Sequence, residues 1–483
     1  MLYLPHAANG MAVWAAALRA HGINAKLLPP PDERSLEWGR RCLDGKECLP
    51  CTLMTGDMVR LIKEDGVDPA KAAFFMPGSC GSCRYDLFNT LQQIVFEDMG
   101  LGGAALVDEY QGANRKLHAI MSGASCGMLA WRGFIAADIL EKLRLHIRPY
   151  ETGAGDTDRA YYACLDRLVE VVERAVIGMV EAMRAVPVDR SRPRPLIGLV
   201  GEAYLRNVDY ASNNIIQSVE QMGGEIRMPA IMEVLWYSLY KQRYFQELGR
   251  HRVKAFIHRV QHGILNRIER KMRRHAASVL PDPYEKPIWE IIGQSGLSLD
   301  AGLGFGASVE MARSGISGII HAIPFNCVPG TVIQGLEGRF RSLFPGIPFM
   351  TVGFSGQADL GVRIRLEALV HQCRSLAPGH AARMSPLPVH GAVGRPPAWL
   401  SPGIRLRRRA AEQGTTCFAI RTTFARNASS RTIPSTRSRS MRTACAPCAP
   451  NRPRKRPGAI GMRWKNALPP IWTACAAPGP TRA

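Results

Sequence analysis

The sequence predicts an α/β protein with two lobes, each built around a parallel sheet. Short apolar segments alternate with longer segments whose apolar residues recur at helical spacing, a pattern typical of parallel strands covered by helices. The alternation occurs twice, and two long helical patterns at 131–149 and 159–186 lie between the two occurrences. The hydrophobic period ends near residue 374, so we expect the folded part to end there.

These patterns divide the chain into four regions. We expect an α/β lobe at 1–130, a helical connector at 131–193, a second α/β lobe at 194–374, and a disordered tail rich in Arg and Pro at 375–483. Both lobes are predicted to be Rossmann-like or flavodoxin-like. In such sheets ligands bind at the carboxyl ends of the strands, so functional residues are expected in the loops that follow them.

The first lobe should alternate strands and helices from its start. The predicted elements are strands at 2–4 and 23–28 around a helix at 11–20, then a helix at 51–63, a strand at 71–76 and a helix at 84–99. Glycines after the helices, such as Gly22 and Gly100, are typical helix stops.

The second lobe should repeat this plan. Strands are predicted at 196–200, 225–228, 315–323 and 347–352, and helices at 213–222, 233–277 and 363–373. Ser212 is the expected N-cap of the helix at 213–222. The glycines between Gly302 and Gly306 imitate a dinucleotide-binding pattern, but no predicted strand precedes them, so we expect a flexible loop.

The positive charge is concentrated in the tail. The chain of 483 residues has a formal net charge of +22, and 375–483 contributes +18 through 19 Lys and Arg residues and one acid, Glu412. The remaining +4 gives no indication of a nucleic-acid-binding protein, although the Arg-rich tail could bind nucleic acid. We interpret the tail either as disordered or as an out-of-frame translation of a GC-rich gene.

The expected cellular compartment follows from sequence features that are absent. It has no apolar run of about 18 residues and no secretory signal pattern. Thirteen cysteines in such a chain are typical of reduced, metal-binding or catalytic thiols rather than disulfides. We therefore expect a cytoplasmic protein without a membrane span.

Cysteines mark three of the predicted loops. Cys48 and Cys51 form one Cys-x-x-Cys pair, Cys80 and Cys83 form a second, and Cys327 lies in a third loop. Each loop leads into a helix or follows a buried strand, so the three are expected to converge. A helix N-terminus helps a thiol to ionise, and glycine-rich loops can donate N–H groups to cluster sulfurs.

The residues alone leave the bound group open. Two Cys-x-x-Cys pairs could hold zinc, although 28 residues between Cys51 and Cys80 exceed the usual zinc-ribbon spacing. An iron–sulfur cluster would use the same ligands. Inert loop cysteines are the third interpretation.

A set of motifs in fixed order carries a family resemblance. The motifs are Gly45-Lys46-Glu47-Cys48-Leu49-Pro50, Cys83-Arg84-Tyr85, Trp131-Arg132-Gly133, Arg148-Pro149-Tyr150-Glu151, Gly201-Glu202 with Ser212-Asn213-Asn214, and Pro324-Phe325-Asn326-Cys327-Val328-Pro329-Gly330. Over 2–373 they resemble the 2-hydroxyacyl-CoA dehydratase/benzoyl-CoA reductase subunit family, in the branch related to CoA-substrate-specific enzyme activases. The chain departs from the family at Ser355-Gly356-Gln357, where the family tends to have Asp-Gly-Gln.

The resemblance implies a cofactor, ligands and partners. It implies a 4Fe–4S cluster held by Cys48, Cys83 and Cys327, with Cys51 and Cys80 as additional ligands or bystanders. It also implies low-potential electron transfer in anaerobic metabolism, a CoA thioester substrate, and either a dehydratase-like lyase or an activase-related component. The first strand starts at residue 2 and no Gly-x-x-x-x-Gly-Lys-Ser/Thr loop is present, so we expect a separate ATP-hydrolysing activase or dehydratase subunit as partner.

Further residues have two interpretations each. Glu202 and Tyr204 follow a predicted strand, where they either line the site or have a structural role. Cys126 is either an additional ligand or an ordinary loop thiol, whereas Cys164 and Cys373 fall in predicted helices as core residues. A non-catalytic, zinc-binding scaffold that recruits a partner protein is the alternative function.

Overall fold

The first sheet is parallel and four-stranded, with the strand order β2-β1-β3-β4. Its strands are β1 (Leu2–Leu4), β2 (Ala25–Leu27), β3 (Ala73–Phe75) and β4 (Ala105–Val107). The structure is a computed structural model that describes residues 1–76, 83–107, 124–170, 172–248, 252–281, 288–295, 299–357 and 360–376. Leu2 of β1 pairs with Ala25 on one side and with Ala73 on the other.

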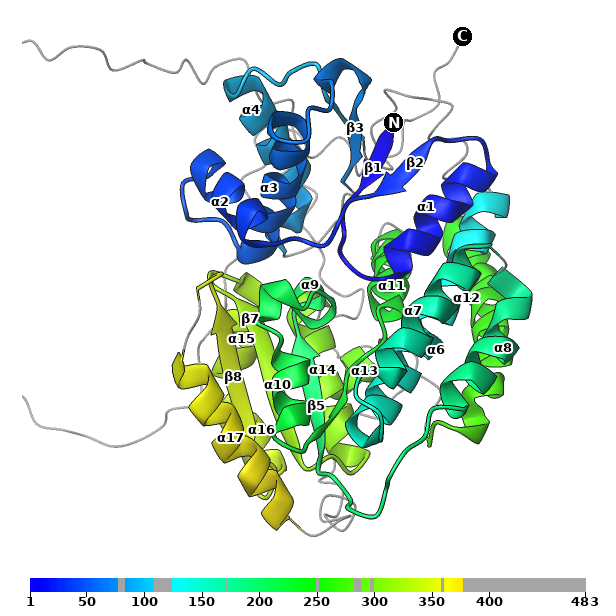
Figure 1. Cartoon of the computed structure of the whole chain (residues 1–483), viewed down its shortest axis with the longest axis vertical. Helices are drawn as coiled ribbons and strands as arrows, with labels where there is room; N and C mark the ends of the chain where they lie inside the picture. The colour runs from blue at the N-terminus through cyan, green and yellow to red at the C-terminus, as the bar shows by residue number, and fades with distance from the viewer. Residues whose placement is uncertain are drawn as a thin grey trace, which may run out of the picture. The chain divides into compact units, whose positions relative to one another are not determined.

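Alternate strand residues face two different layers of helices. Leu4 and Phe75 pack in one apolar cluster with residues of the connector, while Tyr3 and Phe74 pack in another with residues of the helix at 49–63. The helices of this part are α1 (Gly10–Ala20), α2 (Glu33–Cys42), α3 (Leu49–Lys63) and α4 (Phe88–Asp98), with the 3₁₀ turns η1 (Pro69–Lys71) and η2 (Arg84–Leu87) (Figure 1).

Helices α2 and α3 cross at two glycines. A Cβ atom on Gly56 would lie 1.8 Å from the Ser35 carbonyl oxygen, and one on Gly39 would lie 2.1 Å from the Thr52 carbonyl oxygen. The two backbones can approach this closely only because both positions lack a side chain. The contact fixes α3, whose N-cap is Cys48.

The connector consists of long helices that continue the core of the first sheet. It contains α6 (Ala124–Ile147), the 3₁₀ turn η3 (Arg148–Tyr150), α7 (Asp156–Glu170) and α8 (Val172–Arg184). The predicted pattern at 159–186 corresponds to α7 and α8, and residue 171 between them lies outside the described residues. None of the described helices is long and apolar enough to cross a membrane.

The second sheet repeats the first, with the strand order β6-β5-β7-β8. Its strands are β5 (Leu196–Gly201), β6 (Glu225–Arg227), β7 (Gly318–Pro324) and β8 (Phe349–Phe354). Its helices are α9 (Ala203–Asn207), α10 (Ile215–Gln221), α11 (Met232–Leu248), α12 (Arg252–Arg273), α13 (Ile288–Ser295), α14 (Leu299–Arg313), α15 (Val328–Gly335), α16 (Glu337–Leu343) and α17 (Leu360–Ser375), with the 3₁₀ turns η4 (Tyr210–Ser212) and η5 (Arg274–Ser278).

This sheet is also covered on both faces. Helices α10 and α17 lie over one face (Figure 1). Residues of α14 and α16 pack on the other face with Val200 of β5 and Ile319 of β7. Strand β7 is buried along its whole length, as expected for a central strand between two helical layers.

The predicted fold class is confirmed. The described residues form two four-stranded parallel sheets with helices around them, and they belong to one compact unit. The predicted tail at 375–483 lies outside the described residues, apart from its first two positions.

Two local predictions were wrong. The N-cap of α10 is Asn214 rather than Ser212, and Asn213 and Asn214 both have positive φ angles, of 50° and 53°. Asparagine tolerates this left-handed conformation better than most residues, which shifts the helix start. The segment between Gly302 and Gly306 is part of helix α14 rather than a flexible loop.

Candidate metal centre at three helix N-termini

Cys48, Cys83 and Cys327 each occupy an N-cap. Cys48 precedes α3, Cys83 precedes η2 and Cys327 precedes α15. A proline stands in the first turn of α3 and of α15, where the missing N–H is not needed by the helix. Of these three caps, the Cys327 side chain accepts a cap hydrogen bond from its helix, whereas the Cys48 and Cys83 side chains do not.

The turn at Cys327 is tightly packed. The Gly330 N–H donates to the Cys327 Sγ at 3.4 Å. A Cβ atom on Gly330 would lie 2.6 Å from the Ile323 side chain and 3.3 Å from the Cys327 Sγ. The backbone amide of Cys51 also favours the Cys48 thiolate, although without the geometry of a full cap hydrogen bond.

Arg84 joins the three cysteine loops. It follows Cys83 directly, and its guanidinium donates to the Lys46 carbonyl at 3.0 Å and to the Asn326 carbonyl. Lys46 lies two residues before Cys48, and Asn326 lies one residue before Cys327. One planar side chain thus links loops from both sheets, a geometry for which the fork of Arg is suited and Lys is not.

Glu202 provides a negative charge near all three thiols. It follows β5 and caps α9, and its carboxylate accepts from the Leu205 N–H at 2.9 Å. Burial raises the Glu202 pKa, against the effect of the neighbouring backbone N–H groups. The Glu202 charge in turn contributes to the raised pKa of Cys48, Cys83 and Cys327. The sequence placed Glu202 and Tyr204 on a loop, but they are the N-cap and the second residue of a helix.

Burial is the main electrostatic influence on the thiols. It raises the pKa of Cys48 and Cys327 to about 11 and the pKa of Cys83 to about 12. The charge of Cys48 also contributes to the raised pKa of Cys327, and the charge of Cys327 contributes to the raised pKa of Cys83. That Cys48, Cys83 and Cys327 hold one bound group stays a prediction.

No model of a protein family matches the chain. Nor does its sequence have a significant match among curated proteins. The family resemblance carried by the ordered motifs therefore stays a prediction.

The other cysteines divide into separate environments. Cys51 is buried in the first turn of α3, and burial, with a smaller effect of Cys48, raises its pKa. Cys126 lies in helix α6, buried in the apolar cluster of the connector rather than on a loop. Cys164 and Cys373 are buried in helices, as predicted. Cys80 lies outside the described residues.

Among the residues that the structure describes, no three His, Cys, Asp or Glu side chains are grouped closely enough to hold one metal ion.

The sequence analysis did not single out two acidic residues, Asp300 and Asp57. Asp300 of α14 contributes to the raised pKa of Cys83, and it also interacts with the Tyr237 hydroxyl. Asp57 is a buried acid in α3, and burial raises its pKa to about 7. A single acid inside the apolar run Leu53-Met54-Thr55-Gly56-Asp57-Met58-Val59 is a signal that could have indicated this residue.

Proposed function

We propose that the chain is the iron–sulfur component of an ATP-driven, low-potential electron-transfer system that acts on CoA thioesters in the cytoplasm. The observation that carries the proposal is the arrangement of Cys48, Cys83 and Cys327 at three helix N-termini linked by Arg84. The motif resemblance supports the same function, and it implies a separate ATP-hydrolysing partner.

The cofactor proposed for Cys48, Cys83 and Cys327 is a 4Fe–4S cluster, because cysteine thiolates are the usual ligands of such clusters. A bound cluster would supply one-electron chemistry and a Lewis-acidic iron. Because burial raises the pKa of the three thiols, binding of a metal would have to displace their protons.

The protein residues around the thiols have separate roles. Arg84 holds the loops of Cys48 and Cys327 in register. Glu202, fixed by its cap hydrogen bond to the Leu205 amide, adds negative charge beside the thiols and disfavours reduction of a group bound there.

Metal content tests the proposal. The full chain, purified without oxygen, should contain about four iron and four sulfide ions and show the paramagnetic resonance of a reduced cluster after dithionite treatment. Cys48→Ser, Cys83→Ser and Cys327→Ser should each lose most of the iron. Cys42→Ser is the matched control, because Cys42 lies at the end of α2 with its Sγ 3.2 Å from the Met99 Sδ and outside the three loops.

Other metal contents would contradict the proposal. A colourless protein with one zinc ion per chain would support the zinc-binding scaffold instead. Iron retained in all three serine variants would show that other residues hold it.

A further inference from the structure

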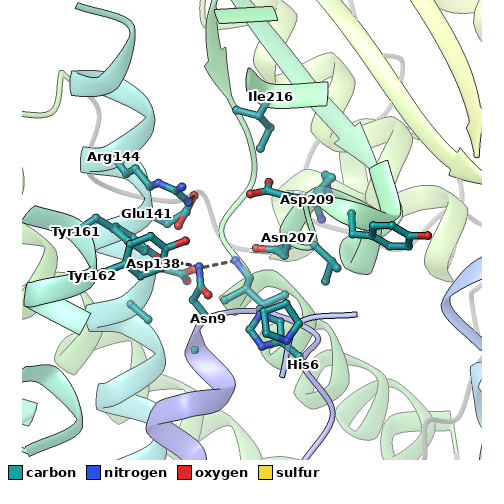
Figure 2. Close-up of a pocket in the computed structure, with 18 residues that line it drawn as sticks. His6, Asn9, Asp138, Glu141, Arg144, Tyr161, Tyr162, Asn207, Asp209 and Ile216 are labelled. Atoms are coloured by element: carbon teal, nitrogen blue, oxygen red, sulfur yellow. Dashed lines mark hydrogen bonds and ion pairs between the residues drawn. The ribbon is translucent and has the colours of Figure 1, made fainter. Parts of the chain in front are cut away.

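Charges around the loop after β1 are balanced inside the protein. A cavity of about 150 Å³ lies beside this loop (Figure 2). The Arg144 guanidinium lies 3.6 Å from the Glu141 carboxylate and 2.7 Å from the Asp158 carboxylate. The Asp209 carboxylate accepts from Gln217 at 2.8 Å. Because each of these charges has a partner, they give no indication of a ligand, and the cysteine pair at the start of α3 offers a reactive chemistry instead.

Cys48 and Cys51 lie in the first turn of one helix. Cys48 is the N-cap of α3, its carbonyl accepts from the Thr52 N–H at 3.2 Å, and Cys51 follows three positions later. Cα atoms three residues apart in a helix are about 5 Å apart, within the range of roughly 4.4–6.8 Å that a disulfide spans. Pro50 lies between the two cysteines, and its fixed φ angle stiffens the turn. The helix start therefore permits a disulfide without movement of the backbone.

The contacts of the two thiols place both sulfurs at this end of α3. Burial is the main influence on the pKa of Cys48, and the Cys51 backbone N–H acts against it by a hydrogen bond to the Cys48 sulfur. Burial also raises the pKa of Cys51, and the charge of Cys48 adds to this effect. The Thr55 side chain hydrogen-bonds Cys51, and its hydroxyl oxygen accepts from Gln92 at 3.3 Å. The Thr55 proton is thereby left to point at the Cys51 sulfur.

The two thiols differ in their access to solvent. Cys48 is half-buried, whereas Cys51 is only 1% exposed. A reagent from solvent therefore meets Cys48 first, and Cys51 lies behind it. A Cys-x-x-Cys pair at a helix N-terminus in an α/β sheet protein is typical of a dithiol that cycles between thiols and a disulfide.

We propose that Cys48 and Cys51 form a redox-active dithiol, which a small disulfide such as oxidised glutathione converts into an intrachain disulfide. The Cys48 Sγ, after losing its proton to solvent, attacks one sulfur of the glutathione disulfide, breaks its S–S bond and releases one glutathione. The Cys51 Sγ, also deprotonated, then attacks the Cys48 Sγ, breaks the mixed disulfide and releases the second glutathione. Two protein thiols are oxidised to one disulfide, and one glutathione disulfide is reduced to two thiols that take up the two protons.

This chemistry does not depend on the proposed cluster, because it needs only the two thiols. A sulfur in a disulfide is not a thiolate ligand, so the two uses of Cys48 exclude each other in time.

Peptide mass spectrometry of the full chain tests the proposal. The chain is purified with a chelator and a reductant, then incubated for a day at pH 8 with excess oxidised glutathione and without denaturant. The remaining thiols are alkylated, and trypsin releases peptide 47–60, which contains Cys48 and Cys51 and no other cysteine. We expect most of this peptide to be unalkylated and two hydrogen atoms lighter than the dithiol form.

Three variants separate the roles of the two thiols. Cys51→Ser should retain glutathione on Cys48, because the thiol that closes the disulfide is gone. Cys48→Ser should take up glutathione on peptide 47–60 roughly tenfold more slowly or less, since only the buried Cys51 remains. Cys42→Ser is the control and should form the disulfide like the unaltered chain, because Cys42 lies at the end of α2 beside Met99.

Four outcomes would overturn the proposal. Peptide 47–60 of the unaltered chain could keep both thiols, or it could retain glutathione on Cys48 without closing the disulfide. Cys48 could be joined to Cys83 or Cys327 instead of Cys51. Cys48→Ser could react with glutathione as fast as the unaltered chain.

Discussion

Burial outweighs the helix N-termini at the three thiols. A helix N-terminus lowers the pKa of a cysteine, and the Arg84 charge acts in the same direction on Cys48 and Cys327. The pKa nevertheless rises to about 11 at both residues because desolvation of the thiolate is the larger effect. The metal-free protein should therefore keep these thiols protonated at neutral pH.

We expect this protonation to protect the metal-free thiols from alkylation. At pH 8, Cys48 and Cys327 should react with iodoacetamide roughly a hundredfold more slowly than a free cysteine, whose pKa is about 8.5. The rate should rise with pH as the thiolate forms and reach half of its maximum near pH 11. Mass spectrometry of the labelled peptides measures each site. Reaction at pH 8 as fast as that of glutathione would show that nearby positive charge, not burial, controls these thiols.

The sequence could single out the three cysteines of the proposed centre, but not the hydrogen bonds that Arg84 makes. Cys48, Cys83 and Cys327 stand out by residue type, spacing and their place beside glycine and proline. Arg84 acts through the carbonyls of Lys46 and Asn326, which are 38 and 242 positions away in the chain. Backbone carbonyls have no residue-type signature, so no sequence pattern indicates such a link.

Two helices, α14 and α2, were not predicted from the sequence, and the glycines of α14 are the reason for the first. Gly306 in α14 lies where a Cβ would be 1.9 Å from the Ile291 carbonyl oxygen, and Gly304 lies where it would be 2.6 Å from Ile333. These glycines allow close packing of a helix, yet in sequence they look like a flexible loop. Helix α2 was also missed, because its sequence is mostly polar and only Ser35, Leu36 and Gly39 are buried.

The crossing of α2 and α3 gives a prediction at the scale of elements. Gly56→Ala should lower the free energy of unfolding by about 3 kcal/mol, because its Cβ would overlap the Ser35 carbonyl oxygen. Gly178→Ala on α8 is the matched control, since nothing lies within 4 Å of its added Cβ and alanine favours a helix by up to about 1 kcal/mol. Urea denaturation measures both variants. An equal effect of the two substitutions would contradict the close crossing.

At the scale of the whole molecule, a buried ion-pair network ties the connector to the second sheet. Arg148 of η3 donates to both carboxylate oxygens of Glu220 in α10, at 2.7 and 3.0 Å, and to Asp158 of α7 at 3.2 Å. The side chains of Arg148 and Glu220 are 8% and 9% exposed. Burial raises the Glu220 pKa even though Arg148 opposes this effect.

Removing one partner of this pair should cost more than removing both. Arg148→Ala leaves Glu220 buried without its main cation, so the free energy of unfolding at pH 7.5 should fall by about 3 kcal/mol or more. The loss should be smaller at pH 5, because the raised pKa lets Glu220 take up a proton in the folded state before it would in the unfolded chain. The double variant Arg148→Met/Glu220→Leu should be more stable than Arg148→Ala, since it leaves no uncompensated charge. Urea midpoints at both pH values measure these differences. A double variant as unstable as Arg148→Ala would contradict the prediction. It would show that packing of the Arg148 side chain, rather than its charge, holds the connector to the second sheet.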